Sequence, residues 1–229
     1  MQSLKWLGVE LVEVSLKEKF VSVAGATLAI YLVSIISHMV LPTSSAVGVV
    51  ASMGATAVLL FAVPHGQLSQ PWPLLGGHFV SALVGVSCAQ AMGSTFLATA
   101  IAVGVSIGLM QQLKCIHPPG GATAFTAVMG GQAIQELGFL YVLIPVGLNA
   151  VAMMTLAIAI NYPFSWRRYP AAWIKRMANS IQDTLVISDD EHRRFVEAVR
   201  SIDSFVDVSE EDLVYLTRTM MQFTQSRGE

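Results

Sequence analysis

The residues that could do chemistry gather in one short segment, KCIHPPGGATAF at positions 114–125. A residue that precedes proline is pushed away from helical geometry, so we expect His117 and Pro118 to be extended and a helix to begin near Pro119. The first free backbone N–H groups of that helix would be those of Gly120, Gly121 and Ala122. Free N–H donors and the positive end of the helix dipole point the same way, which makes such a helix start a binding site for anions.

Side chains beside this helix start supply further groups that suit a small anion. Thr123 offers a hydroxyl, and Lys114 and His117 offer positive charge or hydrogen bonds. Glycine leaves room for a ligand to approach the backbone closely. A helix start with unpaired N–H groups at membrane depth is costly unless it is buried in protein or faces a polar cavity. The segment therefore predicts a broken helix whose N-terminus receives a small anion.

The tetrapeptide Gly-Ala-Thr-Ala occurs twice, at 54–57 and at 121–124, an offset of 67 residues. At the same offset the apolar segment 74–92 falls on the segment 139–160, and the apolar span before each tetrapeptide also has a counterpart. This order indicates a unit of three segments that occurs twice. We therefore expect the first copy to lie opposite the second and to complete a central site or pore with Gly54, Ala55 and Thr56.

The composition is that of a membrane protein. Hydrophobic residues make up 54% of the 229 residues and charged residues only 12%, and the mean hydropathy is +0.61. These values lie outside the usual range of soluble domains. Between Phe20 and Trp166 the only charged side chains are those of Lys114 and Glu136. The two cysteines lie in or beside apolar runs, so we expect no disulfide framework.

A helix needs about 20 apolar residues to cross the hydrocarbon core of a membrane. Four stretches reach that length, 20–40, 74–92, 95–113 and 139–160, while 45–63 and 119–134 are marginal because they are rich in small residues or interrupted by glycine. We predict an all-α polytopic membrane protein with six membrane segments as two three-segment repeats, two of the segments being short or broken. Three crossings per unit force the second copy into inverted topology, as in many transporters. If the two Gly-Ala-Thr-Ala segments only dip into the membrane and return, the copies are parallel.

The distribution of Lys and Arg predicts the orientation, because these residues favour the cytoplasmic side of a membrane. They precede the first span at 17 and 19 and follow the last at 167, 168, 175 and 176. Both termini are therefore expected to be cytoplasmic, with an even number of crossings. Six crossings place Lys114 inside and Glu136 outside, whereas four crossings place Lys114 on the outer face.

Three regions follow from the same distribution. We interpret residues 1–19 as an amphipathic N-terminal segment on the membrane surface, residues 20–166 as the transmembrane domain and residues 167–229 as a cytosolic helical tail. In the tail, Ser188 and Ser209 each stand before acidic residues and an apolar run at helical spacing, which predicts a C-terminal helical hairpin. A hairpin of this size has too small a core to stand alone, so we expect it to dock on the membrane domain or on a second subunit.

Simpler interpretations of these residues stay open. Small residues in membrane helices often serve only to let helices pack closely, and Lys114 could be an interfacial anchor. His65 and His78 flank a loop rich in Pro and Gly, and together with His117 they leave a histidine relay open. Asn149, deep in the last span, is expected to hydrogen-bond between helices.

No enzyme signature is present in the sequence. It contains no nucleophile motif, no carboxylate in the apolar core and no G-x-x-x-x-G-K-S/T phosphate loop. The spacing of His, Cys and carboxylate residues matches no known metal site. We therefore expect neither an enzyme nor a cofactor or metal.

The stretches GATAVLLFAVPHGQLSQPWPLLGGH and IHPPGGATA resemble the HPP family of integral membrane proteins, named for the motif found here at His117, Pro118 and Pro119. The resemblance runs from about residue 20 to RRYP at 167–170, and less specifically into SFVDVSEEDL of the tail. Family members are usually described as having four membrane spans, fewer than the six segments counted above. Some plant and cyanobacterial members are regarded as nitrite transporters, and some bacterial members carry CBS domains, which this chain lacks. The resemblance implies transport of a small anion, with nitrite as the leading candidate.

The sequence as a whole predicts a homo-oligomeric transporter or channel for a small monovalent anion in the bacterial inner membrane. Its expected partners are the lipid bilayer and the anion, and no nucleic acid. A membrane-embedded sensor or scaffold whose cytosolic tail binds a partner is an alternative of another class. A third is a cation path lined by backbone carbonyl groups. A polar cavity that reaches the midplane would favour transport, and a dry, fully packed bundle would favour the scaffold.

Overall fold

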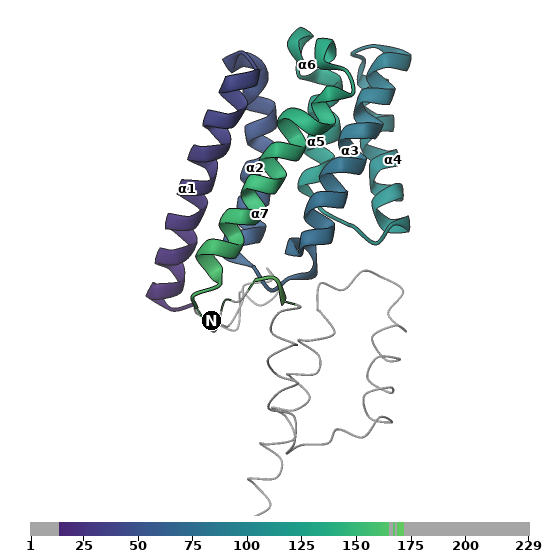
Figure 1. Cartoon of the computed structure of the whole chain (residues 1–229). Helices are drawn as coiled ribbons and strands as arrows, with labels where there is room; N and C mark the ends of the chain where they lie inside the picture. Colours follow the sequence, from purple (N-terminus) through teal and green to yellow (C-terminus); the bar gives the residue numbers. More distant parts are fainter. Residues whose placement is uncertain (1–13, 165–166, 168, 172–229) are drawn as a thin grey trace, which may run out of the picture.

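The structure is a computed structural model that describes residues 14–164, 167 and 169–171. Its elements are helical (Figure 1): α1 (Leu16–Val40), α2 (Thr43–Ala62), the 3₁₀ turn η2 (Gln67–Ser69), α3 (Pro71–Met92), α4 (Phe96–Gln112), α5 (Pro119–Met129), α6 (Gln132–Leu137), the π-helical stretch η3 (Val142–Gly147) and α7 (Leu148–Asn161). The predicted all-α fold is thus confirmed for this part of the chain. The predicted C-terminal hairpin and most of the N-terminal segment 1–19 lie outside the described residues.

Four helices of the described chain are long and apolar enough to cross a membrane. They are α1, α2, α3 and the stretch Val142–Asn161, in which η3 leads into α7 and the backbone leaves helical geometry at Ile144. Helix α4 is apolar but has 17 residues, about 25 Å along its axis, so the prediction that 95–113 reaches the full length of a span is wrong. Helix α5 has 11 residues. The short α5 agrees with the broken segment predicted at 119–134. Four long spans also agree with the number that the resemblance implied.

The prediction that 45–63 is a marginal segment is wrong, because α2 is a continuous helix of 20 residues. Its polar residues do not interrupt the helix, since their hydroxyls bond carbonyl oxygens one turn back. Ser52 Oγ donates to Val49 O at 2.8 Å, and Thr56 Oγ1 lies 3.2 Å from Ser52 O. A carbonyl oxygen one turn back can therefore accept from a hydroxyl inside the helix without breaking the helix.

Successive long helices run in opposite directions through the bundle, so the two ends of the described chain come together (Figure 1). Glu18, near the start of α1, forms an ion pair with Arg167, which follows α7. Lys114, in the connection from α4 to α5, lies at this same end of the bundle, and Glu136 of α6 lies at the other.

The contacts between helices follow a regular pattern. Helix α1 packs against α2 and α7, and α4 packs against α5 and α3. Helix α2 contacts α7 just as α5 contacts α3, and α2 crosses α5. Exchanging α1 with α4, α2 with α5 and α3 with α7 leaves this set of contacts unchanged. The same pairs of helices therefore touch in the two halves, although α3 contacts α5 much more extensively than α2 contacts α7.

Small residues let α3 and α5 approach each other closely. A Cβ atom added to Gly85 of α3 would lie 2.6 Å from Ala127 Cβ and 2.8 Å from Ala124 O of α5. One added to Gly120 of α5 would lie 2.7 Å from Ser81 Oγ of α3. Small residues at four-residue spacing are a common way for membrane helices to pack backbone against backbone. This contact fixes the position of α5, and with it the positions of His117 before the helix and Thr123 within it.

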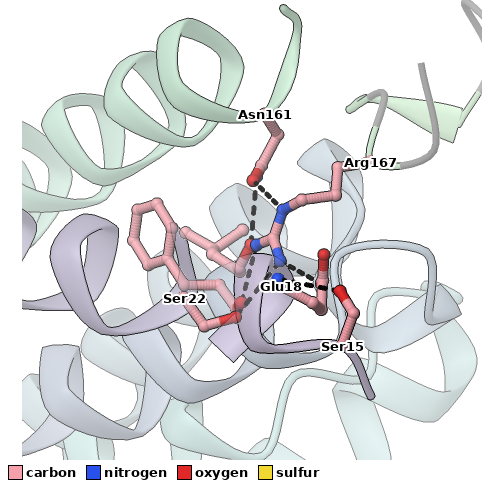
Figure 2. A network of polar contacts seen from close by, with 7 residues as sticks. Ser15, Glu18, Ser22, Asn161 and Arg167 are labelled. Carbon is pink, nitrogen blue, oxygen red and sulfur yellow. Dashed lines mark hydrogen bonds and ion pairs between the residues drawn. The ribbon is translucent and has the colours of Figure 1, made fainter. Parts of the chain in front are cut away.

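A buried arginine closes the end of the bundle where the chain enters and leaves (Figure 2). Arg167 Nε donates to Asn161 Oδ1 at 3.0 Å, and its Nη2 donates to Phe61 O at 2.7 Å. Its Nη1 donates to Ser22 Oγ at 3.1 Å and forms the ion pair with Glu18. A cation beside the last carbonyl groups of α2 also opposes the negative end of that helix dipole. The guanidinium group therefore joins the start of α1 to the ends of α2 and α7.

Gly85→Ala is expected to lower the stability of the purified protein by about 1–3 kcal/mol, because overpacking forces a tight interface apart. The matched control is Gly104→Ala in α4, where an added Cβ would meet nothing within 4 Å. That variant should be neutral or slightly stabilising, since alanine favours a helix over glycine. Thermal unfolding in detergent measures both changes. Equal melting temperatures for the two variants would contradict the close packing of α3 on α5.

Candidate functional site

A buried histidine joins the two copies of the Gly-Ala-Thr-Ala sequence. His78 of α3 has its Nε2 atom 2.9 Å from Thr56 Oγ1 of α2 and its Nδ1 atom 2.8 Å from Thr123 Oγ1 of α5. All three side chains are buried. The two threonines occupy the same position in the repeated tetrapeptide, so one imidazole ring bonds equivalent hydroxyls of both copies.

A second histidine extends these bonds toward the end of the bundle where Arg167 lies. His117 Nε2 lies 3.2 Å from Thr56 Oγ1, and His117 Nδ1 lies 2.8 Å from the carbonyl oxygen of Leu68. The rings of His78 and His117 are 4.9 Å apart between centroids and meet edge to face at 65°. The result is a continuous chain of hydrogen bonds from Leu68 to Thr123, which we call the histidine chain.

The carbonyl of Leu68 fixes the direction of every proton in the histidine chain. A carbonyl oxygen only accepts, so His117 carries its proton on Nδ1 and its Nε2 accepts from the Thr56 hydroxyl. Thr56 Oγ1 then accepts from His78 Nε2–H, and His78 Nδ1 accepts from the Thr123 hydroxyl. With both rings neutral, every ring nitrogen has one partner of the right kind. The chain is therefore complete without any charged group.

The histidine chain depends on the close approach of the segment before α5 to α3. A Cβ atom at Gly77 would lie 2.5 Å from His117 Cβ, so only glycine lets this segment pass beside His78. From the other side, Tyr141 Oη donates to the carbonyl oxygen of Thr123 at 3.2 Å. Glycine on α3 and a buried tyrosine after α6 thus hold the two ends of the site in place.

The backbone donors at the start of α5 are used within their own turn. Gly120 N–H donates to His117 O at 2.8 Å, and Gly121 N–H donates to Pro118 O at 3.0 Å. The helix begins at Pro119 as predicted, but Pro118 has helical angles, φ −51° and ψ −39°, so the prediction that it is extended is wrong. The turn bond that His117 O accepts favours these angles over the usual preference of a residue before proline. The two glycine N–H groups are therefore not free donors.

Other residues predicted for the site face away from the histidine chain. Ala55 and Ala122 are exposed on the outer faces of their helices. A Cβ atom at Gly54 would meet nothing within 4 Å, and one at Gly121 would meet only Val103, at 3.9 Å. Of the nine predicted residues, the histidine chain brings together Thr56, Thr123 and His117, and Gly120 packs beside them.

Two pockets open on either side of the histidine chain. One, of about 270 Å³, is lined by Leu68, Gln111, Lys114 and Ile116 at the end of the bundle near Arg167. The other, of about 630 Å³, lies toward α6 and is lined by Ser44, Ser45, Gly48, Thr126, Gly130 and Glu136. Leu68 belongs both to the first pocket and to the histidine chain, and Thr126 lies one turn beyond Thr123. The chain therefore stands between pockets at opposite ends of the bundle.

The sequence does not predict His78 as a substrate-binding residue and indicates it only as a member of a histidine relay. The sequence carries one signal for it, because an ionisable residue inside a membrane segment is expensive unless it serves a function. Leu68 could not be predicted, since it takes part through its carbonyl group. Asn149 donates to Ser37 Oγ at 2.8 Å, which confirms the hydrogen bond expected between helices.

Comparisons with known proteins support a single family. The family model for the HPP transmembrane region matches residues 12–170. A transmembrane protein of Dictyostelium discoideum is 34% identical over 175 residues, which are 74% of this chain and 56% of that protein. A second from the same organism is 39% identical over 128 residues, 54% of this chain and 45% of that protein. The chain thus spans about half the length of these curated relatives, and no solved structure matches it.

The direction of the histidine chain predicts two different tautomers. His117 is expected to carry its proton on Nδ1 and His78 on Nε2, because the Leu68 carbonyl sets the order. NMR of the protein with isotope-labelled histidine distinguishes the two forms, and His78→Gln and His117→Gln assign the signals. The same tautomer at both rings would contradict the assignment.

Thr56→Val is expected to destabilise the protein by about 1–3 kcal/mol, because it leaves the facing nitrogens of two buried rings without a partner. Thr155→Val is the control: Thr155 is exposed on α7 and bonds only the carbonyl of Val151 in its own helix. Its loss should change the stability by less than about 0.5 kcal/mol. Thermal unfolding in detergent compares them, and a Thr56 variant as stable as the control would rule out this role for the hydroxyl.

Proposed function

The chain belongs to the family of HPP transmembrane-region proteins, and we propose that it is a transporter or channel for small monovalent anions, with nitrite as the first candidate. The observation that carries the proposal is the histidine chain. Two imidazole rings and two hydroxyls inside a membrane bundle cost desolvation that an apolar core would avoid. A protein that only anchored a tail would gain nothing from them. Groups of this kind can donate hydrogen bonds to an anion that enters between the helices.

The charges near the histidine chain support an anion rather than a cation. Among the described residues from 20 to 164, the only carboxylate is that of Glu136. It lines the pocket toward α6 and accepts a hydrogen bond from Gln132 Nε2 at 2.8 Å. Lys114 lines the pocket at the other end and is exposed. A cation at a pocket mouth raises the local concentration of anions. A cation in the core would find no carboxylate among these residues to balance its charge.

We also propose that the six apolar helices are two inverted repeats of three. The proposal is supported by the antiparallel order of the helices and by the contact pattern, which is unchanged when α1, α2 and α3 are exchanged with α4, α5 and α7. Thr56 and Thr123 further support it, because equivalent residues bond one ring. In transporters built this way, the substrate site lies where the repeats meet. That place here is the histidine chain.

The remaining features of the proposal come from the sequence. Lys and Arg at both ends support cytoplasmic termini, and the large exposed apolar surface of the bundle suits both lipid and a homo-oligomer. The bacterial inner membrane remains a proposal, since the relatives described above are from Dictyostelium. The alternative role as a sensor or scaffold rests on the tail, most of which lies outside the described residues.

Uptake of nitrite into liposomes that contain the purified full chain tests the proposal. We expect uptake well above that of empty liposomes, with nitrate, formate and chloride as competitors that define the selectivity. Thr123→Val should reduce uptake at least about tenfold, the effect of losing about 1.4 kcal/mol of interaction. Thr155→Val should leave it unchanged. Uptake no faster than in empty liposomes, under either a voltage or a proton gradient, would exclude nitrite and favour the sensor or scaffold.

A further inference from the structure

We propose that the His78–His117 pair takes up one proton with each anion, so that the protein carries the anion and the proton together. The inference rests on the proposed function and adds the coupled ion. It follows from three properties of the histidine chain. The chain can accept a proton without leaving a donor unpaired, it can hold only one, and it contains nothing that would neutralise the added charge.

His78 can be protonated with only a rotation of a hydroxyl. In the neutral state its Nδ1 atom accepts from the Thr123 hydroxyl. A proton added to the lone pair of Nδ1 makes this atom a donor, and Thr123 Oγ1 becomes the acceptor. The Thr123 proton then turns to the carbonyl oxygen of Pro119, which lies 3.4 Å from Oγ1. The new N–H bond is the only covalent bond that forms, none is broken within the protein, and each donor retains a partner.

His117 can be protonated in the same way. A proton on its Nε2 atom turns the bond with Thr56 around, so that Thr56 Oγ1 accepts from both rings. A hydroxyl oxygen has two lone pairs for this purpose. The Thr56 proton then turns to the carbonyl oxygen of Ser52, 3.2 Å away. Each of the two threonines therefore has a second acceptor one helical turn back.

The pair can hold only one additional proton. The ring centroids are 4.9 Å apart, and two positive charges at that distance repel strongly in a buried site. The titratable side chains packed nearby are those of Tyr141, which donates to the carbonyl oxygen of Thr123, and Cys115, whose buried thiol lies against Gly76. Helices α2, α4 and α5 contribute no titratable group to this part of the described chain.

An imidazolium in this site would therefore lack a counterion within the described protein. A buried unpaired charge costs several kcal/mol after relaxation, so protonation becomes favourable only when an anion binds beside it. Because coupling between two binding events is reciprocal, the protonated pair in turn binds the anion more tightly. The two ions enter as a neutral pair, and moving them across the membrane transfers no net charge.

The test uses the full chain in liposomes and compares two driving forces. With the membrane potential clamped at zero, a proton gradient that is acidic outside should accelerate nitrite uptake, and an internal pH dye should record one proton per nitrite. A membrane potential without a proton gradient should have no effect. Empty liposomes correct for nitrous acid that crosses the bilayer unaided. Uptake that responds to potential and not to the proton gradient would overturn the coupling and leave anion transport intact.

Variants assign the coupling to the pair. His78→Gln and His117→Gln keep a donor and an acceptor but hold no proton, so each should lose the response to the proton gradient. His38→Gln is the matched control, because His38 is exposed near the end of α1. It should respond as the parent does. A parental response in both variants of the pair would overturn the assignment.

A binding measurement separates this inference from the proposed function. In NMR of the parent protein with isotope-labelled histidine, nitrite should convert one ring of the pair to imidazolium at mildly acidic pH, and without nitrite both should stay neutral. An imidazolium that forms equally without nitrite, or that never forms with it, would overturn the coupling. Absence of nitrite uptake alongside a nitrite-dependent imidazolium would overturn transport and keep the coupled binding.

Discussion

The bonds that His78 makes with Thr56 and Thr123 are the interaction on which the rest of this structure depends. Inside a membrane no water can satisfy a ring nitrogen, so both nitrogens must find partners in the protein. Here each finds a hydroxyl from a different copy of the same tetrapeptide. The ring therefore fixes α2, α3 and α5 relative to one another, and it places equivalent residues of the two halves on either side of a single group.

Close packing makes these bonds available. Helix α3 presents Gly77, Ser81 and Gly85 to α5, and α5 presents Gly120 in return. Larger residues would hold the helices apart and leave His117 too far from Thr56 to bond it. In lipid, helices gain little from burying apolar surface against one another, so such contacts and hydrogen bonds supply much of the stability. The buried Arg167 applies the same principle at the end of the bundle, where it joins three helix ends through charge and hydrogen bonds.

A neutral polar core is well suited to an ion that brings its own counterion. The histidine chain is satisfied in the uncharged state, yet each threonine has a second acceptor that lets the direction of its bond reverse. Such a site can take up a proton with little structural change, and it does so when an anion binds beside it. The pockets on either side, one lined by Lys114 and one by Glu136, differ in the charge that a small ion would meet first. The two ends of the bundle are therefore electrostatically distinct.

The sequence by itself determined the class of this protein. The length and order of the apolar segments establish an all-α membrane bundle, Pro119 marks the start of a short helix, and the repeated tetrapeptide marks Thr56 and Thr123 as equivalent. It did not establish which face of each helix turns inward. Successive residues of a helix point about 100° apart, so Gly121 and Ala122 turn outward while Thr123 turns inward. Only the packing of α3 against α5 decided that phase, and it also brought His78 and the carbonyl of Leu68 to residues far away in the sequence. Apolar length and helix-breaking residues are local properties, whereas the partner of a buried polar atom depends on how whole helices pack.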